Sequence, residues 1–179
     1  MHFTIDLRTC ELRRNGSRKG SNRAPNLIDG GEYQVVTEMA SAKDGVSVPI
    51  TLVSKRCNRE GRGSVPDPGP FLLIGYGAYG LPVTVEYDPQ VMALLQRGFS
   101  VGYAHCRGGG EYGSHWHAAG KGMLKWNTFN DFAACAEHLI SKRYTSPSLL
   151  CGMGTSAGGL IMGVMANEFP HLFAALIMR

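Results

Sequence analysis

The pattern of hydrophobic and polar residues changes in character along the chain. In the first 54 residues apolar and polar positions alternate, which is typical of strands with one face in water. Asp44–Gly45 is a strong hairpin-turn signal, and Pro49 indicates that the strand after it lies near the edge of its sheet. Glu11–Leu12 can start one further strand. The strands expected in this part are 3–7, 33–40 and 46–54.

From residue 71 onward, short and wholly apolar runs alternate with segments of helical periodicity. Such runs are typical of strands that are buried on both faces, as in a parallel sheet covered by helices. The sequence therefore predicts an α/β fold, with three parallel strands, two full crossovers and flanking helices. The expected strands are 71–74, 99–105, 148–151 and 173–178, and the expected helices are 89–97, 127–142 and 157–168.

A candidate catalytic motif lies between the strand at 148–151 and the helix that follows it. Gly154-Thr155-Ser156-Ala157-Gly158 matches G-x-S-x-G in a strand–turn–helix context, which is typical of a nucleophile elbow. The sharp turn is expected to strain the backbone of Ser156, while Gly154 and Gly158 let strand and helix approach closely. Free backbone N–H groups and the positive end of the helix dipole can then stabilise an oxyanion.

The same stretch allows a second interpretation. Gly152, Gly154 and Ala157 also fit G-x-G-x-x-G/A, the fingerprint of dinucleotide-binding folds. No acidic residue follows about 20 positions later to hold a ribose hydroxyl, which counts against this interpretation. Arg179 could suit a 2′-phosphate, so a dinucleotide-binding domain stays open as the weakest alternative.

Composition narrows the class of protein further. The 179 residues, 44% of them hydrophobic and 18% charged, suit one globular domain without an apolar run of membrane-spanning length, so we expect no membrane association. Five widely spaced cysteines without C-x-x-C predict reduced thiols and a cytoplasmic protein. The net charge of +4 comes from the amino-terminal third, where the basic run between Arg13 and Arg23 has no interleaved aromatic residue for base stacking, so no nucleic acid is expected. His115-x-His117 lacks a third ligand, and no metal or other cofactor is expected.

Several separated motifs carry a resemblance to a known family. They are Gly75–Gly80 (GYGAYG), Arg107–Gly113 (RGGGEYG) with Trp116, Lys125 with Asn127–Asp131, Tyr144–Pro147, and Gly154–Gly159 (GTSAGG). Together they resemble the prolyl oligopeptidase family of serine peptidases, and in detail its oligopeptidase B branch. The resemblance covers about residues 33–179 and implies an α/β-hydrolase domain preceded by a β-propeller. Residues 1–31 are then expected to be a propeller remnant and linker, and residues 32–179 an incomplete catalytic domain.

The resemblance also implies roles for individual residues. Ser156 matches the nucleophile, and the Ala157 N–H and the Tyr76 hydroxyl match the two oxyanion donors. Tyr79 matches a position that lines the pocket for the residue before the cut, with a core aromatic as an equal alternative. The implied function is a serine-type endopeptidase that hydrolyses short peptides, after Lys or Arg in this branch.

Two further motif residues, Arg107 and Glu111, are more simply explained as part of a salt-bridged or hydrogen-bonded loop that supports the active edge of the sheet. We therefore expect them to have a structural role rather than a catalytic one.

The acid and the histidine of a triad are expected after the serine in this fold. After Ser156 the chain offers Glu168 and His171, which the helix carries roughly 18 Å away at about 1.5 Å per residue. No carboxylate is expected to orient His105 in the manner of the family. We therefore expect a carboxyl-terminally truncated peptidase that is inactive alone and lacks the segment that completes the triad. An esterase or thioesterase of the same fold, or a non-catalytic interaction protein, remain alternatives.

Overall fold

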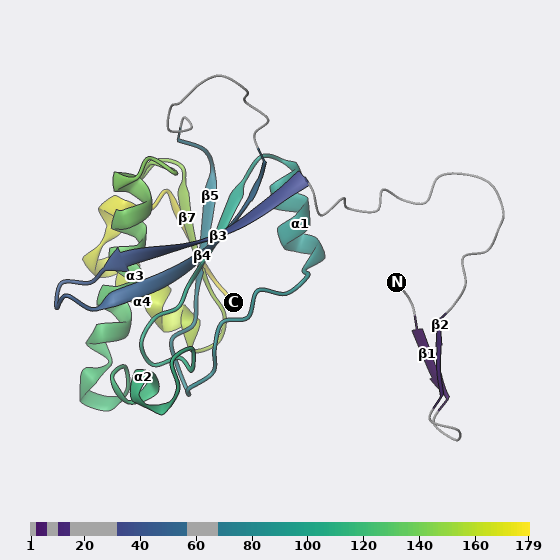
Figure 1. Cartoon of the computed structure of the whole chain (residues 1–179). Coiled ribbons are helices and arrows are strands. Elements are labelled where there is room, and N and C mark those ends of the chain that lie inside the picture. Colours follow the sequence, from purple (N-terminus) through teal and green to yellow (C-terminus); the bar gives the residue numbers. More distant parts are fainter. Residues whose placement is uncertain (1–2, 7–10, 15–31, 57–67) are drawn as a thin grey trace.

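The computed structural model describes residues 3–6, 11–14, 32–56 and 68–179, which form a small hairpin and a mixed sheet flanked by helices (Figure 1). Within these residues the large sheet has six strands in the order β3-β4-β6-β5-β7-β8. The strands are β3 (Tyr33–Ser41), β4 (Ser47–Lys55), β5 (Phe71–Gly75), β6 (Ser100–Ala104), β7 (Leu150–Gly154) and β8 (Ala175–Met178).

The sheet has an antiparallel part and a parallel part. β3 and β4 form the predicted hairpin, and β4 also pairs antiparallel with β6. From β6 through β5 and β7 to β8 all pairs are parallel, which gives four parallel strands where the sequence predicted three. Pro49 lies in β4, opposite Met39 of the edge strand β3; because β4 also pairs with β6, the proline lies next to the edge, as predicted, rather than on the edge strand itself.

Helices cover both faces of this sheet (Figure 1). α1 (Pro89–Gln96) packs on one face, and α3 (Trp126–Ser141) and α4 (Gly158–Glu168) pack on the other. α1 begins where the Asp88 carboxylate accepts a hydrogen bond from the Gln90 N–H, with Pro89 in the first turn. These three bounds agree with the predicted helices to within one residue, whereas the short helices α2 (Ser114–Ala118), η2 (Gly122–Leu124) and η3 (Pro170–Leu172) were not predicted.

The apolar strand β5 separates two hydrophobic clusters. Phe71 and Leu73 face α3 and α4, while Leu72 faces α1, because side chains alternate along a strand. Both faces are buried, which explains why this strand is apolar at every position. Residues of the larger cluster include Phe132, Leu139, Ile161 and Met165, and those of the smaller one include Val91, Leu95, Val101 and Tyr103.

The first residues form a separate element. β1 (Phe3–Asp6) and β2 (Glu11–Arg14) pair antiparallel, so the second strand that Glu11–Leu12 suggested is present. Within the stretch that the sequence assigned to a propeller remnant and linker, Arg13 and Arg14 thus belong to a strand and pair with Thr4 and Phe3. Residues 15–31 and 57–67 lie outside the described residues. Among the described helices, none has the length and apolar character needed to cross a membrane.

Candidate active site at the carboxyl edge of the parallel strands

Ser156 occupies the sharp turn that the sequence predicted. β7 ends at Gly154, α4 begins at Gly158, and Ser156 between them has a φ of 54°, which is unfavourable for a residue with a side chain. A Cβ on Gly154 would overlap the backbone of Gly158, and a Cβ on Gly158 would come within 2.5 Å of the Gly75 carbonyl oxygen. The predicted strain and the predicted close approach of the two glycines are both confirmed.

The Ser156 side chain is exposed and has no hydrogen-bond partner among the described residues. Its backbone N–H donates to the Arg179 carbonyl oxygen at 2.7 Å, which ties the elbow to the end of β8. The space beside Gly152 is occupied by Leu176 and Met162, so this glycine of the dinucleotide fingerprint serves packing inside the domain.

Tyr76 and Ala157 flank the elbow from two neighbouring segments. Because Ile74 pairs with Met153 in parallel strands, Tyr76 stands level with Thr155, just beyond the sheet. Tyr76 is half-buried, and no described residue hydrogen-bonds its hydroxyl. The Ala157 N–H likewise has no partner in the described part of the chain. Both groups therefore have an unused hydrogen-bond donor at the same edge of the sheet as Ser156.

Tyr79 is not a core aromatic. Its side chain is 74% exposed and its φ is 56°, so the alternative that placed it in the core is wrong. It lines a hollow of about 550 Å³ together with Ala157, Leu160 and Lys125. A second hollow of about 600 Å³ is lined by residues that include Tyr76, Thr155, Tyr103 and Arg179. The residues on either side of Ser156 thus line two different hollows.

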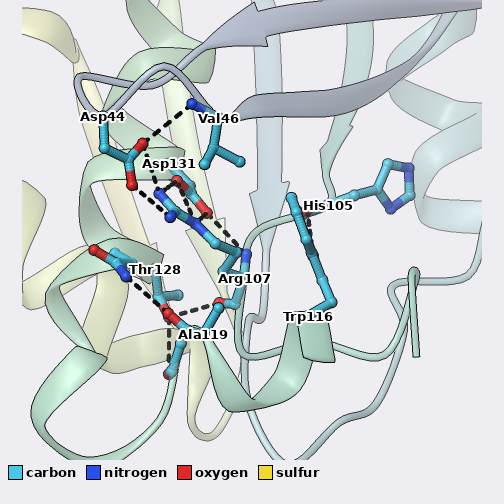
Figure 2. Close-up of polar contacts among 10 residues, drawn as sticks. Asp44, Val46, His105, Arg107, Trp116, Ala119, Thr128 and Asp131 are labelled. Atoms are coloured by element: carbon cyan, nitrogen blue, oxygen red, sulfur yellow. Dashed lines mark hydrogen bonds and ion pairs between the residues drawn. The ribbon is translucent and has the colours of Figure 1, made fainter. Parts of the chain in front are cut away.

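Arg107 has the structural role that the sequence favoured for it. Figure 2 shows its guanidinium between Asp44, in the β3–β4 turn, and Asp131, on α3. The contacts are 2.6 Å from Nη1 to Asp44 and 2.6 Å from Nη2 to Asp131, and Nε and the backbone N–H of Arg107 also donate to Asp131. The hydrogen bonds that Arg107 donates to Asp131 raise the pKa of Arg107 against the opposing effect of burial. No sequence signal linked Asp44 to Arg107, because the two are 63 positions apart.

A carboxylate lies beside His105, but not in the arrangement of a catalytic triad. The His105 Nδ1 is 3.3 Å from the Glu111 carboxylate, and its Nε2 is 2.8 Å from the Thr51 hydroxyl. Glu111 also accepts from the Val83 N–H, so this cluster joins β4, β6 and the loop before α1. It lies at the β4–β6 side of the sheet and makes no hydrogen bond to Ser156.

The remaining histidines within the described ranges are either hydrogen-bonded or exposed. His117 pairs with the Gly108 carbonyl and His138 with Glu38, while His115 and His171 are exposed. In the described part of the chain no group of three His, Cys, Asp or Glu side chains is placed to hold a metal ion.

A serine on a strained turn between a parallel strand and a helix, with unused hydrogen-bond donors at the same edge of the sheet, is the arrangement of an α/β-hydrolase. The sequence pattern of the prolyl oligopeptidase family matches residues 85–179. The chain belongs to this family, as its motifs predicted.

Proteins that are similar to this chain in sequence and structure carry peptidase names. Protease 2 from Moraxella lacunata is 40% identical over 139 residues, which are 77% of this chain and 19% of that protein. The prolyl endopeptidase-like protein from Xenopus laevis is 35% identical over 179 residues, 100% of this chain and 24% of the relative. The structure of oligopeptidase B from Trypanosoma brucei with covalently bound antipain is 36% identical, with a TM-score of 0.79 over 98% of this chain and 24% of that one. The chain thus spans about a fifth to a quarter of their length.

Proposed function

We propose that the full-length protein is a serine-type oligopeptidase with Ser156 as its nucleophile. Full-length protein here means a chain that extends over the length of its relatives, and the experiments below use it. The observation that carries the proposal is the exposed Ser156 hydroxyl on a backbone held at φ 54°. Strain of this kind persists only where the surroundings enforce it, and it is concentrated at functional sites.

The reaction follows from the groups around Ser156. Its Oγ attacks the peptide carbonyl carbon, and the carbonyl oxygen becomes an oxyanion that accepts hydrogen bonds from the Ala157 N–H and the Tyr76 hydroxyl. The serine proton passes to a general base and from there to the leaving amine as the C–N bond breaks. Water then cleaves the acyl ester and regenerates the serine.

The general base is proposed to be a histidine, oriented by an acid, from outside the described residues. This part of the proposal is motivated by the Ser156 hydroxyl, which no described side chain contacts, and by the histidines engaged elsewhere. Serine at its ordinary pKa is a weak nucleophile and needs such a partner.

Cleavage after Lys or Arg is the finer part of the proposal, and similarity to oligopeptidase B motivates it. The hollow beside Tyr79 contains Lys121 and Lys125 and no acidic residue. The carboxylates that would bind a basic side chain are therefore expected from the remainder of the full-length protein. We further propose that residues 1–31 are a propeller remnant and linker, that residues 32–179 belong to the catalytic domain, and that the protein is cytoplasmic.

Labelling with a fluorophosphonate tests the nucleophile. The full-length protein should carry the label on Ser156, identified by mass spectrometry, and Ser156→Ala should lose both the label and peptide hydrolysis. Ser148→Ala is the matched control, since Ser148 is exposed and bonds only Ser146 among the described residues. Peptidase activity near wild type in Ser156→Ala would remove Ser156 as the nucleophile.

A panel of peptide anilides tests the specificity. The full-length protein should show a higher kcat/KM with Arg or Lys before the scissile bond than with Pro or Leu at that position. A preference for Pro would contradict the assignment to oligopeptidase B-like specificity while leaving the role of Ser156 intact. Turnover of simple esters or thioesters without peptide hydrolysis would instead favour the esterase alternative.

A further inference from the structure

The loop that carries Tyr76 has an unusual backbone. Gly77, Tyr79 and Gly80 all have positive φ values, of 57°, 56° and 65°. Glycine adopts such values easily, but Tyr79 does so at a cost of order 1–3 kcal/mol. This loop, residues 75–80, must therefore be held in place by contacts that outweigh its own preference.

Lys125 supplies the central contact. Its Nζ donates to the Gly77 carbonyl oxygen at 2.5 Å and to the Thr128 hydroxyl at 3.2 Å, and it lies 5.8 Å from the centre of the Phe129 ring. The Gly77 carbonyl also packs against Gly108, where any side chain would collide with it. Gly77 is thus enclosed by the start of α3 on one side and by the loop after β6 on the other.

The neighbour on the other side of Tyr76 is fixed as well. The Gly75 carbonyl oxygen lies so close to Gly158 that a Cβ there would come within 2.5 Å of it. Gly75 thereby contacts the elbow, and Gly77 contacts Lys125. The main chain of Tyr76 is anchored at both adjacent residues, which sets the direction in which its side chain leaves the backbone.

The ammonium group of Lys125 is costly where it lies. It is half-buried, burial lowers its pKa, and no described carboxylate forms an ion pair with it. A charged group in such surroundings needs strong hydrogen bonds, and a bond from an ammonium to a carbonyl is about twice as strong as a neutral one. Lys125 also sits directly before α3, whose packing on the sheet fixes its position.

We propose that Lys125 is a positioning residue that, through the Gly77 carbonyl, holds the Tyr76 hydroxyl where the oxyanion forms. This inference rests on the proposed function and deepens it. Lys125 lines the hollow beside Tyr79, but its Nζ is bonded to the Gly77 carbonyl and the Thr128 hydroxyl, and it makes no hydrogen bond to Ser156 among the described contacts. Its loss frees the loop to relax from the strained Tyr79 conformation and turns the Tyr76 donor away from the reacting carbonyl.

A double-mutant cycle on kcat in the full-length protein tests this. Lys125→Met keeps the length of the side chain and removes the donor; we expect kcat to fall roughly 10- to 100-fold with little change in KM, since a misplaced group of this kind costs up to about 10². In a Tyr76→Phe background the same change should cost less than about threefold, because the donor it positions is already absent. Lys125→Arg should recover part of the loss, and Lys142→Met, at the far exposed end of α3, should have no effect.

A second readout separates positioning from general destabilisation. A peptide aldehyde forms a hemiacetal with the serine, so its affinity should fall together with kcat in Lys125→Met, whereas the affinity of a product peptide acid should not. If Lys125→Met is unfolded at the assay temperature, Lys125→Gln is used, with the same coupling to Tyr76→Phe expected.

Failure of the Lys125 inference can be distinguished from failure of the proposed function. Additive losses in the cycle, or a normal kcat in Lys125→Met, would overturn the positioning role while Ser156→Ala remains inactive. An active Ser156→Ala would overturn the proposed function itself.

Discussion

Two loops at the same edge of the sheet differ in whether their polar side chains are hydrogen-bonded. After β6, Arg107 is 4% exposed, and its guanidinium is bonded to Asp131 and Asp44. After β7, Ser156 is exposed, its hydroxyl has no described partner, and its backbone is strained. Buried polar groups in native proteins are nearly always paired, so the bonded Arg107 needs no ligand to explain it. The elbow has unused donors and stored strain, as the proposed function requires.

Glycine-rich motifs have two different structural roles in these loops. Around Arg107 the glycines let loops pack against one another, as where Gly110 meets Gly80. Around Ser156 the glycines let a strand and a helix converge on a strained residue. The first arrangement should control stability with little direct effect on chemistry, and the second should control chemistry.

The largest effect on stability is expected from Asp131→Asn. The Asp131 side chain is fully buried, and removing its charge leaves the buried Arg107 cation with Asp44 alone. Breaking a buried pair in this way costs about 3–5 kcal/mol. Urea unfolding of the full-length protein, followed by tryptophan fluorescence, measures the loss. If Asp131→Asn and Asp44→Asn lower the free energy of unfolding by the same amount, burial does not explain the contribution of the Arg107–Asp131 ion pair.

The next prediction is a loss of catalytic rate on substitution of a residue beside the elbow. Tyr76→Phe removes one hydroxyl and little volume, so the fold should be unchanged. Because the donor acts on charge that develops in the transition state, the loss should appear in kcat, roughly 10²–10³-fold, with KM nearly constant. Steady-state kinetics of the full-length protein on a peptide anilide measure it. A change confined to KM would mean that Tyr76 only shapes the binding surface.

A smaller effect is expected at the glycines that form the turn. Gly154→Ala places a methyl group into the backbone of Gly158 and should destabilise the protein by about 1–3 kcal/mol or more, with loss of activity. The matched control is Gly163→Ala, inside α4, where a Cβ meets nothing within 4 Å. That change should stabilise by roughly 0.5–1 kcal/mol, because alanine favours a helix interior over glycine. Thermal melts of both variants decide the point, and equal destabilisation would contradict the close-approach argument.

Much of the fold could be predicted because its signals are local. The wholly apolar run at β5 and the periodicity of α3 follow directly from burial on two faces or on one. The strain at Ser156 was also predictable, since G-x-S-x-G between a strand and a helix admits few geometries. The β1–β2 pairing was only partly predicted because its strands are short and their pattern is weak.

The partners of the polar residues could not be predicted. Asp44 was visible in the sequence as a turn residue and Asp131 as part of a motif, but their meeting at Arg107 depends on the three-dimensional packing of three distant segments. The same holds for Glu111 beside His105 and for Lys125 on the Gly77 carbonyl. Sequence patterns indicate which residue types are present, whereas the relative placement of sheet edges and loops decides which of them pair.

The smallest effect expected is the pH dependence that Asp44 contributes. The hydrogen bonds from Arg107 lower the pKa of this carboxyl, so between the folded and the unfolded value the unfolded chain binds more protons. The stabilisation is fully present above the unfolded pKa of about 3.9 and is lost as the pH falls through the lower folded value. Because the Asp44 side chain is 45% exposed, we expect at most about 1 kcal/mol.

Thermal unfolding of wild type and Asp44→Asn between pH 3 and pH 7 measures this contribution. The difference between the two melting temperatures should be constant from pH 7 to about pH 5. It should shrink below about pH 4, where Asp44 of the unfolded chain is protonated first and the folded carboxylate follows at lower pH. Glu137→Gln, an exposed carboxylate on α3 without an ion pair among the described residues, should show a smaller dependence. A difference that stays constant down to pH 3 would mean that the Asp44 charge does not contribute to the stability of the fold, and that Asp131 alone supplies the ionic stabilisation of Arg107.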